Sequence, residues 1–96
     1  MHILFIGDIV GTPGRRILRD RLRGLLSEYP ADLVIANAEN AAAGLGINAV
    51  ILNELFSIGI HAVTMGNHTW SKKEIFNFVE SEPRLVRPFN VSPLWP

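Results

Sequence analysis

The feature that most restricts how this chain can fold is its alternation of short, continuously apolar runs with longer amphipathic stretches. An apolar run without polar alternation is typical of a strand that is buried on both faces of a parallel sheet. The amphipathic stretches between the runs predict the helices that connect parallel strands. The runs occupy residues 2–8, 33–38, 62–65 and 85–89, of which the last is interrupted by Pro88. The order βαβαβαβ therefore predicts an α/β domain with a mostly parallel sheet.

The first amphipathic stretch carries start and stop signals for a helix. Thr12 is a typical N-cap residue and Pro13 a typical first helical residue, while Tyr29-Pro30 should end the helix. The arginines of this stretch are expected to form the solvated face of the helix rather than a nucleic-acid surface. The apolar stripe at helical spacing consists of Ile17, Leu18, Leu22, Leu25 and Leu26.

Two further helices are expected between the later strands. Asn48 is a suitable N-cap for the second helix, and Gly59 should close it. Ser71 and Glu74 have the spacing of a capping box, in which each side chain bonds the backbone of the other. This pair predicts a third helix that runs to about residue 80.

Charge and composition exclude several classes of protein. The 96 residues include 9 basic and 9 acidic side chains, and this balance argues against direct nucleic-acid binding through phosphate attraction. The chain has no cysteine, which excludes disulfide scaffolds and thiolate metal sites. No apolar run approaches the roughly 20 residues that span a bilayer, and we identify no signal peptide, so a cytoplasmic location is the default expectation. The mean hydropathy of +0.22 is high for so small a domain and predicts apolar surface made for a partner or a missing segment.

Polar side chains that can bind cations follow each of the first three predicted strands. The residues are Asp8 after the first, Glu39 and Asn40 after the second, and Asn67 and His68 after the third. Because ligands of parallel α/β sheets bind beyond the carboxyl ends of the strands, we expect these side chains to converge at one edge. Carboxylate and amide oxygens suit Mn²⁺, Fe²⁺ or Mg²⁺, and imidazole adds affinity for Fe, Zn or Mn. The edge is therefore a candidate site for a pair of divalent cations bridged by a carboxylate.

Each of these polar groups also has a purely structural interpretation. Asp8 could cap a turn into the first helix, and Glu39-Asn40 could lie in a solvated loop. Asn67-His68 could form a turn whose histidine is satisfied by a neighbour. Their joint occurrence at three successive strand ends favours the metal site over three unrelated turns.

Two other features near the strand ends have a weaker functional interpretation. The glycines at positions 7, 11 and 14 do not have the spacing of a dinucleotide-binding fingerprint, and Asp8 would repel a pyrophosphate there. Trp70 either shapes the wall of a pocket or packs in the core.

The motifs at the strand ends resemble those of a known enzyme family. The segments that carry the resemblance are 5–15 (FIGDIVGTPGR), 37–42 (NAENAA), 66–70 (GNHTW) and 86–88 (VRP). With these segments the chain is similar over its whole length to the bacterial branch of the calcineurin-like metallophosphoesterases that hydrolyses 2′,3′-cyclic nucleotides. The Gly-Asn-His segment is shared widely across metallophosphoesterases, and the first two segments are more specific to this branch.

The resemblance implies roles for the five polar residues at the strand ends. Asp8 and Asn40 would hold a first metal ion, Glu39 would bridge both ions, and Asn67 would hold the second. His68 would donate a proton to the leaving alkoxide. The ions would be Fe or Mn, with Zn and Mg as alternatives, and the substrate a small cyclic nucleotide or related phosphodiester.

The resemblance also implies that part of the fold lies outside this sequence. Members of the family are more than twice this length, and their later strands supply three more metal-binding histidines. Apart from His68, this chain has only His2 and His61. Residues 1–96 therefore resemble the N-terminal half of a single metallophosphoesterase domain, an αββα sandwich of two sheets whose C-terminal half is absent. The uncovered sheet would then associate with that missing half or with another copy.

The function expected on this basis is hydrolysis of a phosphodiester at a dinuclear metal site. Two alternatives remain open at this stage. The isolated chain could be a catalytically incomplete fragment that folds and self-associates. It could also be a metal-free nucleotide-binding α/β module, which predicts that a chelator leaves ligand affinity unchanged.

Overall fold

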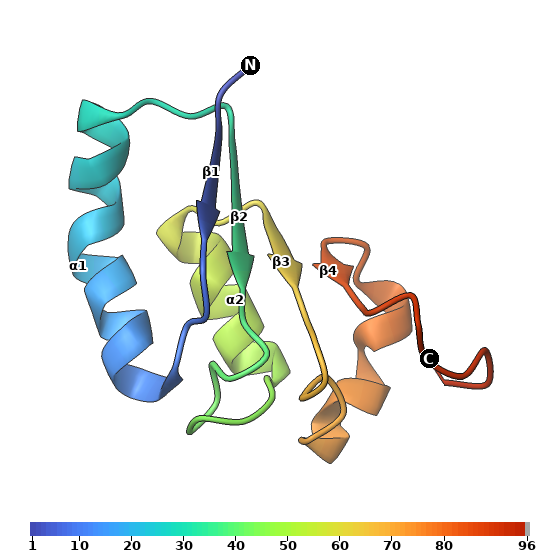
Figure 1. Ribbon diagram of the computed structural model, residues 1–96. Helices are drawn as coiled ribbons and strands as arrows, with labels where there is room; N and C mark the ends of the chain where they lie inside the picture. Colours follow the sequence, from blue (N-terminus) through green and yellow to red (C-terminus); the bar gives the residue numbers. More distant parts are fainter. Residues whose placement is uncertain (96) are drawn as a thin grey trace.

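The computed structural model, which describes residues 1–95, contains a four-stranded sheet whose neighbouring strands are all parallel (Figure 1). The strands lie side by side in sequence order. Their bounds are Ile3–Ile6 (β1), Leu33–Asn37 (β2), Ala62–Thr64 (β3) and Leu85–Val86 (β4). The predicted parallel α/β sheet is confirmed.

The strand order also decides which face of the sheet the helices cover. Because the order never reverses and crossovers between parallel strands are right-handed, successive connections are expected on the same face. Figure 1 shows α2 behind the strands. The connections are α1 (Gly11–Glu28), α2 (Ala49–Ile58) and two short 3₁₀ helices, η1 (Lys73–Asn77) and η2 (Val79–Ser81).

The core lies between these helices and one face of the sheet. On that face Val34, Ala36 and Val63 are fully buried. They form one apolar cluster with side chains of every connection: Leu22 of α1, Leu52 and Leu55 of α2, Ile75 of η1 and Val79 of η2. This cluster fixes the strands relative to the helices and thereby positions the loops beyond the strands.

No helix among residues 1–95 covers the opposite face of the sheet. Ile3 and Phe5 of β1 are 56% and 57% exposed, and Val86 of β4 is 52% exposed. The register places Ile3 beside Leu33 and Phe5 beside Ile35, so the exposed face is apolar. The prediction that the first strand is buried on both faces is therefore wrong for the described residues, because all the connections cover the other face.

The accessible surface is larger than a compact monomer of this mass requires. A 10.6 kDa protein is expected to expose roughly 5,500 Å². This chain exposes 6097 Å². The excess agrees with an apolar sheet face that lacks a partner.

The first helix begins two residues earlier than predicted, and Thr12 is not its cap. Val10 occupies the N-cap position and makes no side-chain cap hydrogen bond. Gly11 has φ +57°, a conformation that favours glycine, and its N–H donates to the carbonyl of Asn40 at 2.9 Å. The Thr12 hydroxyl instead accepts a hydrogen bond from Arg15. The backbone contact of Gly11 with the next strand end, rather than a side-chain cap, therefore fixes the start of α1.

The apolar stripe of α1 is buried only in part. Leu22 is buried and Leu18 and Leu26 are partly buried against the core, whereas Ile17 and Leu25 are 64% and 40% exposed. The reason is that β1 is an edge strand, so the sheet covers one narrow side of the helix.

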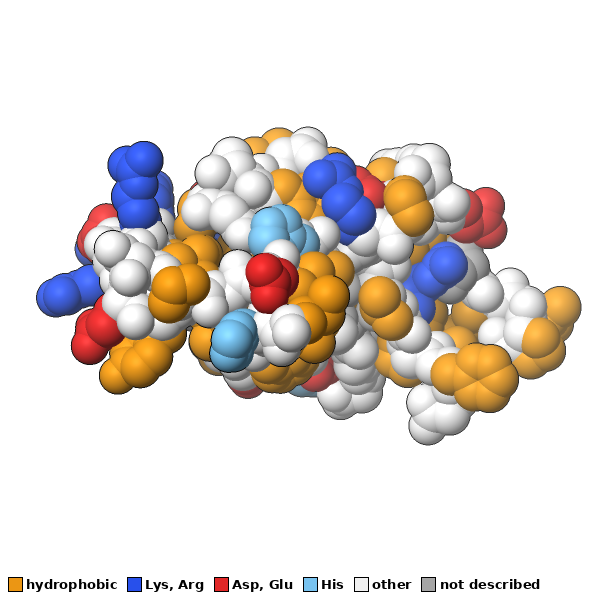
Figure 2. Space-filling view, turned by 90° about the horizontal axis from the view of Figure 1, so that it is seen from above, with side chains coloured by type: hydrophobic (Ala, Val, Ile, Leu, Met, Phe, Trp, Pro, Cys, Tyr) orange, Lys and Arg blue, Asp and Glu red, His pale blue; other side chains and the backbone are white. Residues whose placement is uncertain are grey.

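Neither α1 nor any other helix within residues 1–95 is long and apolar enough to cross a membrane. Figure 2 shows basic side chains that project from the surface. The solvated basic face of α1 is confirmed by its exposed arginines: Arg16, Arg19, Arg21 and Arg23.

The second helix has the predicted ends. The Asn48 side chain accepts a hydrogen bond from the N–H of Ile51 at 2.9 Å, and Gly59 closes the helix at φ +127°. Both residues supply what the helix termini need, an acceptor at the start and a left-handed turn at the end.

The third predicted helix is wrong. Lys72, not Ser71, precedes η1, and no side-chain cap hydrogen bond forms there. The backbone bonds of this segment join residues three apart, as from Phe78 N–H to Ile75 O and from Ser81 N–H to Phe78 O. The run from residue 76 to 79, Phe-Asn-Phe-Val, consists of weak helix formers, and a capping box cannot compensate for them over so short a segment.

Candidate functional site

Backbone hydrogen bonds join the loops that follow the first three strands. The Gly11 N–H of the first loop donates to Asn40 O of the second at 2.9 Å. The Ala38 N–H of the second loop donates to Thr64 O at the end of β3 at 3.0 Å. The predicted convergence of the strand ends at one edge is therefore present in the fold.

Three of the predicted site residues form a chain of hydrogen bonds. The Asn40 amide nitrogen donates to Asp8 Oδ1 at 2.9 Å, and Asn40 Oδ1 lies 2.5 Å from His68 Nδ1. Because the amide nitrogen faces the carboxylate, the amide oxygen faces His68 and can only accept. His68 Nδ1 must therefore carry the hydrogen, which leaves Nε2 of the same ring for other chemistry.

Glu39 lies on the backbone side of the same histidine. Its Oε2 accepts a hydrogen bond from the His68 N–H at 3.1 Å and lies 3.8 Å from His68 Nδ1. Its Oε1 accepts from the Asn37 amide at 3.4 Å. Glu39 is thus oriented by residues of two strand ends, β2 and β3.

The Glu39 carboxylate lies directly over Gly66. A Cβ built on Gly66 would lie 2.7 Å from the carboxyl carbon of Glu39, so a larger residue at position 66 would have to displace this carboxylate. The hydroxyl of the buried Thr69 also donates to the Gly66 carbonyl and fixes the turn. The conformation of the turn is therefore coupled to the position of Glu39.

Replacing Gly66 by alanine should destabilise the fold. The added methyl must displace Glu39 or the backbone, at a cost of about 1–3 kcal/mol in the free energy of unfolding. Gly24 in α1 is the matched control, because a Cβ there meets nothing within 4 Å. Gly24→Ala should stabilise the helix by about 0.5–1 kcal/mol. Urea denaturation of both variants measures the difference, and equal stability of Gly66→Ala and the wild type would contradict the packing argument.

Asn67 is not part of the hydrogen-bonded group. Within residues 1–95 it makes no hydrogen bond to Asp8, Glu39, Asn40 or His68, although it adjoins His68 in the chain. Its side chain is exposed and lines a pocket that also contains Trp70. The structure therefore brings together four of the five predicted site residues and leaves Asn67 at their margin.

The donor set fits a hard divalent cation, but only in part. Asp8 and Glu39 supply carboxylate oxygens, and Asn40 supplies an amide oxygen, which are the donors that Mg²⁺ and Mn²⁺ prefer. Within residues 1–95, no three His, Cys, Asp or Glu side chains form a group that could hold a metal ion alone. The remaining ligands of an octahedral ion must therefore come from water or from another segment.

Sequence reasoning missed Asn37, Gly66 and Thr69. Asn37 is the one polar residue in the run of β2; its amide orients Glu39, and its buried Oδ1 has no partner among the described residues. A polar residue within a buried strand was the signal that could have identified it. Gly66 and Thr69 lie in the segment 66–70 that carries part of the resemblance, but their contacts with Glu39 and with each other could not be predicted, because they depend on how the turn folds.

His61 lies at the opposite end of the sheet, where the strands begin. Its Nδ1 accepts a hydrogen bond from the Val34 N–H at 2.9 Å, which satisfies the start of β2. Figure 2 looks onto this end of the molecule. His61 therefore supports the sheet and is remote from the candidate site.

The structure is similar to two solved structures over its whole length. One is a protein of Thermus thermophilus, with 43% identity and a TM-score of 0.89. The other is a phosphatase of Mycoplasma pneumoniae, with 40% identity and a TM-score of 0.92. This chain covers 37% and 34% of those two chains. The fold is therefore that of part of a larger phosphatase-like protein.

The sequence comparisons agree with the structural ones. The chain is 50% identical over 90 residues to a Bacillus subtilis (strain 168) protein named 2′,3′-cyclic-nucleotide 2′-phosphodiesterase. The match covers 94% of this chain but 34% of that protein, so the chain spans about a third of its relative's length. The model of the YmdB-like protein family matches residues 4–96. The chain therefore belongs to the YmdB-like family, as the motifs at its strand ends predicted.

Proposed function

We propose that this chain is part of a metal-dependent phosphodiesterase that hydrolyses 2′,3′-cyclic nucleotides or related phosphodiesters. The observation that supports the proposal most is the hydrogen-bonded group of Asp8, Asn40 and His68, with Glu39 bound to the His68 backbone. The name of the Bacillus subtilis relative supplies the substrate class.

The strand-end residues would share two divalent ions. Asp8 and Asn40 would hold the first ion, Glu39 would bridge the two, and Asn67 would hold the second. Asn40 can bind an ion and His68 together, because an amide oxygen has two lone pairs. Iron or manganese suits these ligands best, and zinc or magnesium is the alternative. When bound, such a pair of ions lowers the pKa of water and neutralises phosphate charge.

His68 would protonate the leaving group. Its Nδ1 hydrogen is held by Asn40 Oδ1, so the protonated ring has Nε2–H available for the substrate. A water molecule supplies the OH that adds to phosphorus and releases its other proton to solvent, while the bond from phosphorus to one ribose oxygen breaks. His68 gives its proton to that oxygen, which leaves as a hydroxyl group.

A chimera tests this function directly. Residues 1–95 replace the matching third of the Bacillus subtilis phosphodiesterase, and we call this protein the chimera. We expect it to hydrolyse 2′,3′-cyclic AMP with Mn²⁺ and to lose the activity when the metal is removed by a chelator. A folded chimera that binds Mn²⁺ yet hydrolyses neither cyclic AMP nor another phosphodiester would refute the proposal. If the chimera stays active after the chelator has removed the metal, the proposed metal dependence is refuted.

We also propose that the isolated chain associates with another copy of itself through the uncovered face of the sheet. Exposed Ile3 and Phe5 form an apolar surface that another sheet could cover. We expect the isolated chain to elute above its 10.6 kDa mass, and Phe5→Lys to shift it to the monomer.

Size-exclusion chromatography with light scattering measures this shift. Phe89→Lys is the control, because Phe89 is also fully exposed but lies outside the sheet. A monomeric wild type, or equal shifts for both variants, would contradict association through the sheet face.

A further inference from the structure

A pocket opens beside the candidate site and is not used by the chemistry proposed above. It encloses about 390 Å³, a volume in the range of small-molecule sites. Gly66 and Asn67 line it, and Gly66 also lies against the Glu39 carboxylate. The pocket therefore adjoins Glu39 and His68, the residues that would act on a phosphodiester.

Two tryptophans form the aromatic part of this pocket. The rings of Trp70 and Trp95 meet edge to face, with centroids 4.9 Å apart and planes at 64°. Trp70 packs against the hydrophobic core, whereas Trp95 is 56% exposed. Trp70 thus buttresses an exposed aromatic ring, an arrangement suited to stacking with a flat ligand.

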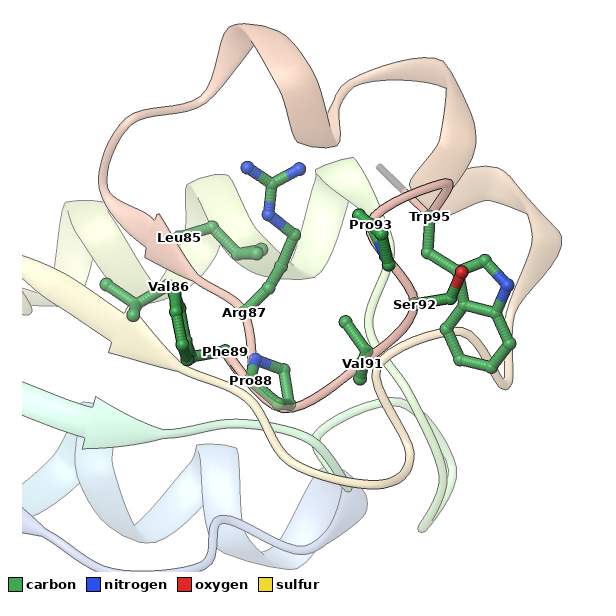
Figure 3. Close-up of a pocket in the computed structure, with 9 residues that line it drawn as sticks. All are labelled: Leu85, Val86, Arg87, Pro88, Phe89, Val91, Ser92, Pro93 and Trp95. Carbon is green, nitrogen blue, oxygen red and sulfur yellow. The ribbon is translucent and has the colours of Figure 1, made fainter.

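The backbone after β4 holds Trp95 in place. Its N–H donates to the Ser92 carbonyl at 3.0 Å, which closes a turn at the end of the segment. Figure 3 shows the Trp95 indole at the end of this segment, turned away from Arg87. The adjoining groove drawn there, of about 770 Å³, shares Pro88, Val91 and Trp95 with this pocket but includes none of the five predicted site residues.

Polar groups accompany the aromatic rings. The amides of Asn67 and Asn90 line the pocket, and each offers both a donor and an acceptor. A purely apolar ligand would leave these amides without hydrogen-bond partners, whereas a heterocycle with donors and acceptors at its edge would satisfy them.

We propose that this pocket binds the nucleobase of the substrate, which stacks on Trp95 with its edge toward the two asparagine amides. The inference rests on the proposed function, because the phosphodiester then lies at Glu39 and Asn67 while the base extends toward Trp95. It assigns substrate selectivity to the segment after β4, which contributes nothing to the predicted metal site.

Intrinsic fluorescence tests the pocket selectively. The chain contains 2 tryptophans, and both line this pocket, so their emission reports on it alone. The 96-residue chain is titrated without metal with 2′,3′-cyclic AMP and with glycerol 1,2-cyclic phosphate, which lacks a base. We expect saturable quenching by cyclic AMP only. Equal responses to the two compounds, or no saturable response, would overturn the assignment.

Variants locate the effect at Trp95. Trp95→Ala, read through Trp70, should weaken cyclic AMP binding roughly 5- to 150-fold, the range found when a stacking aromatic is removed. Trp95→Phe should retain most of the affinity. Phe89→Ala is the control, because Phe89 is exposed on the same segment but does not line this pocket. Equal losses in Trp95→Ala and Phe89→Ala would overturn the stacking role.

The result is separable from that of the chimera. Quenching by cyclic AMP without hydrolysis by the chimera would support the proposed nucleobase pocket and refute the proposed phosphodiesterase function. Hydrolysis by the chimera without quenching would refute the base pocket alone.

Discussion

Replacing His68 by alanine in the chimera should slow hydrolysis of 2′,3′-cyclic AMP by about 10²–10⁴-fold, the usual contribution of a general acid. The metal content should not change, because in the proposed site the imidazole binds Asn40 rather than an ion.

The control for His68 is another histidine of the same chain. His2 is exposed at the opposite end of the sheet, so His2→Ala should leave both the rate and the metal content unchanged. Loss of metal from His68→Ala would show that the imidazole is a ligand, and an unchanged rate would remove it from the reaction.

The convergence of the site could be predicted because it depends on topology alone. Asp8, Glu39 and His68 are about thirty residues apart in sequence, yet each follows a strand of the same parallel sheet. Parallel strands end at one edge whatever their side chains are, so three predicted strands were sufficient to bring the polar groups together. The hydrogen bonds among Asp8, Asn40 and His68 are the detailed form of that convergence.

Predictions that depended on a single local motif were less reliable. Ser71 and Glu74 have capping-box spacing, but the residues that follow them disfavour an α-helix and form 3₁₀ turns instead. Thr12 has the chemistry of an N-cap, but Gly11 adopts a left-handed conformation and bonds Asn40 from a different loop. In both cases an interaction outside the motif determined the outcome.

The uncovered face of the sheet illustrates a different limit. The continuous apolar run of β1 correctly indicates that both faces of the strand favour burial. The sequence does not indicate that the connections within residues 1–95 cover only one of the two faces, because a strand has the same apolar residues whether or not a partner covers it. The expected apolar surface and the exposed Ile3 and Phe5 are therefore two aspects of one property.

Glu39→Gln should abolish stoichiometric binding of Mn²⁺ by the chimera. A carboxylate that bridges two cations offers a negative oxygen to each, whereas a neutral amide offers one acceptor oxygen and one NH₂ donor group. The substitution keeps the size of the side chain, so it respects the tight contact with Gly66. Its amide oxygen can still accept from the His68 N–H. The variant should therefore keep the fold and lose only the negative charge. Isothermal titration calorimetry with Mn²⁺ measures the resulting loss of metal binding.

Glu54→Gln is the matched control for this loss of charge. Glu54 lies on α2, where it forms ion pairs with Arg15 and Arg19 at 4.0 and 3.8 Å. Neither pair includes a residue of the candidate site, so Glu54→Gln should bind Mn²⁺ as the wild type does. A chimera that keeps two equivalents of Mn²⁺ after Glu39→Gln would refute the bridging role. Loss of metal in both variants would mean that general electrostatics, rather than a bridging carboxylate, holds the ions at the strand ends.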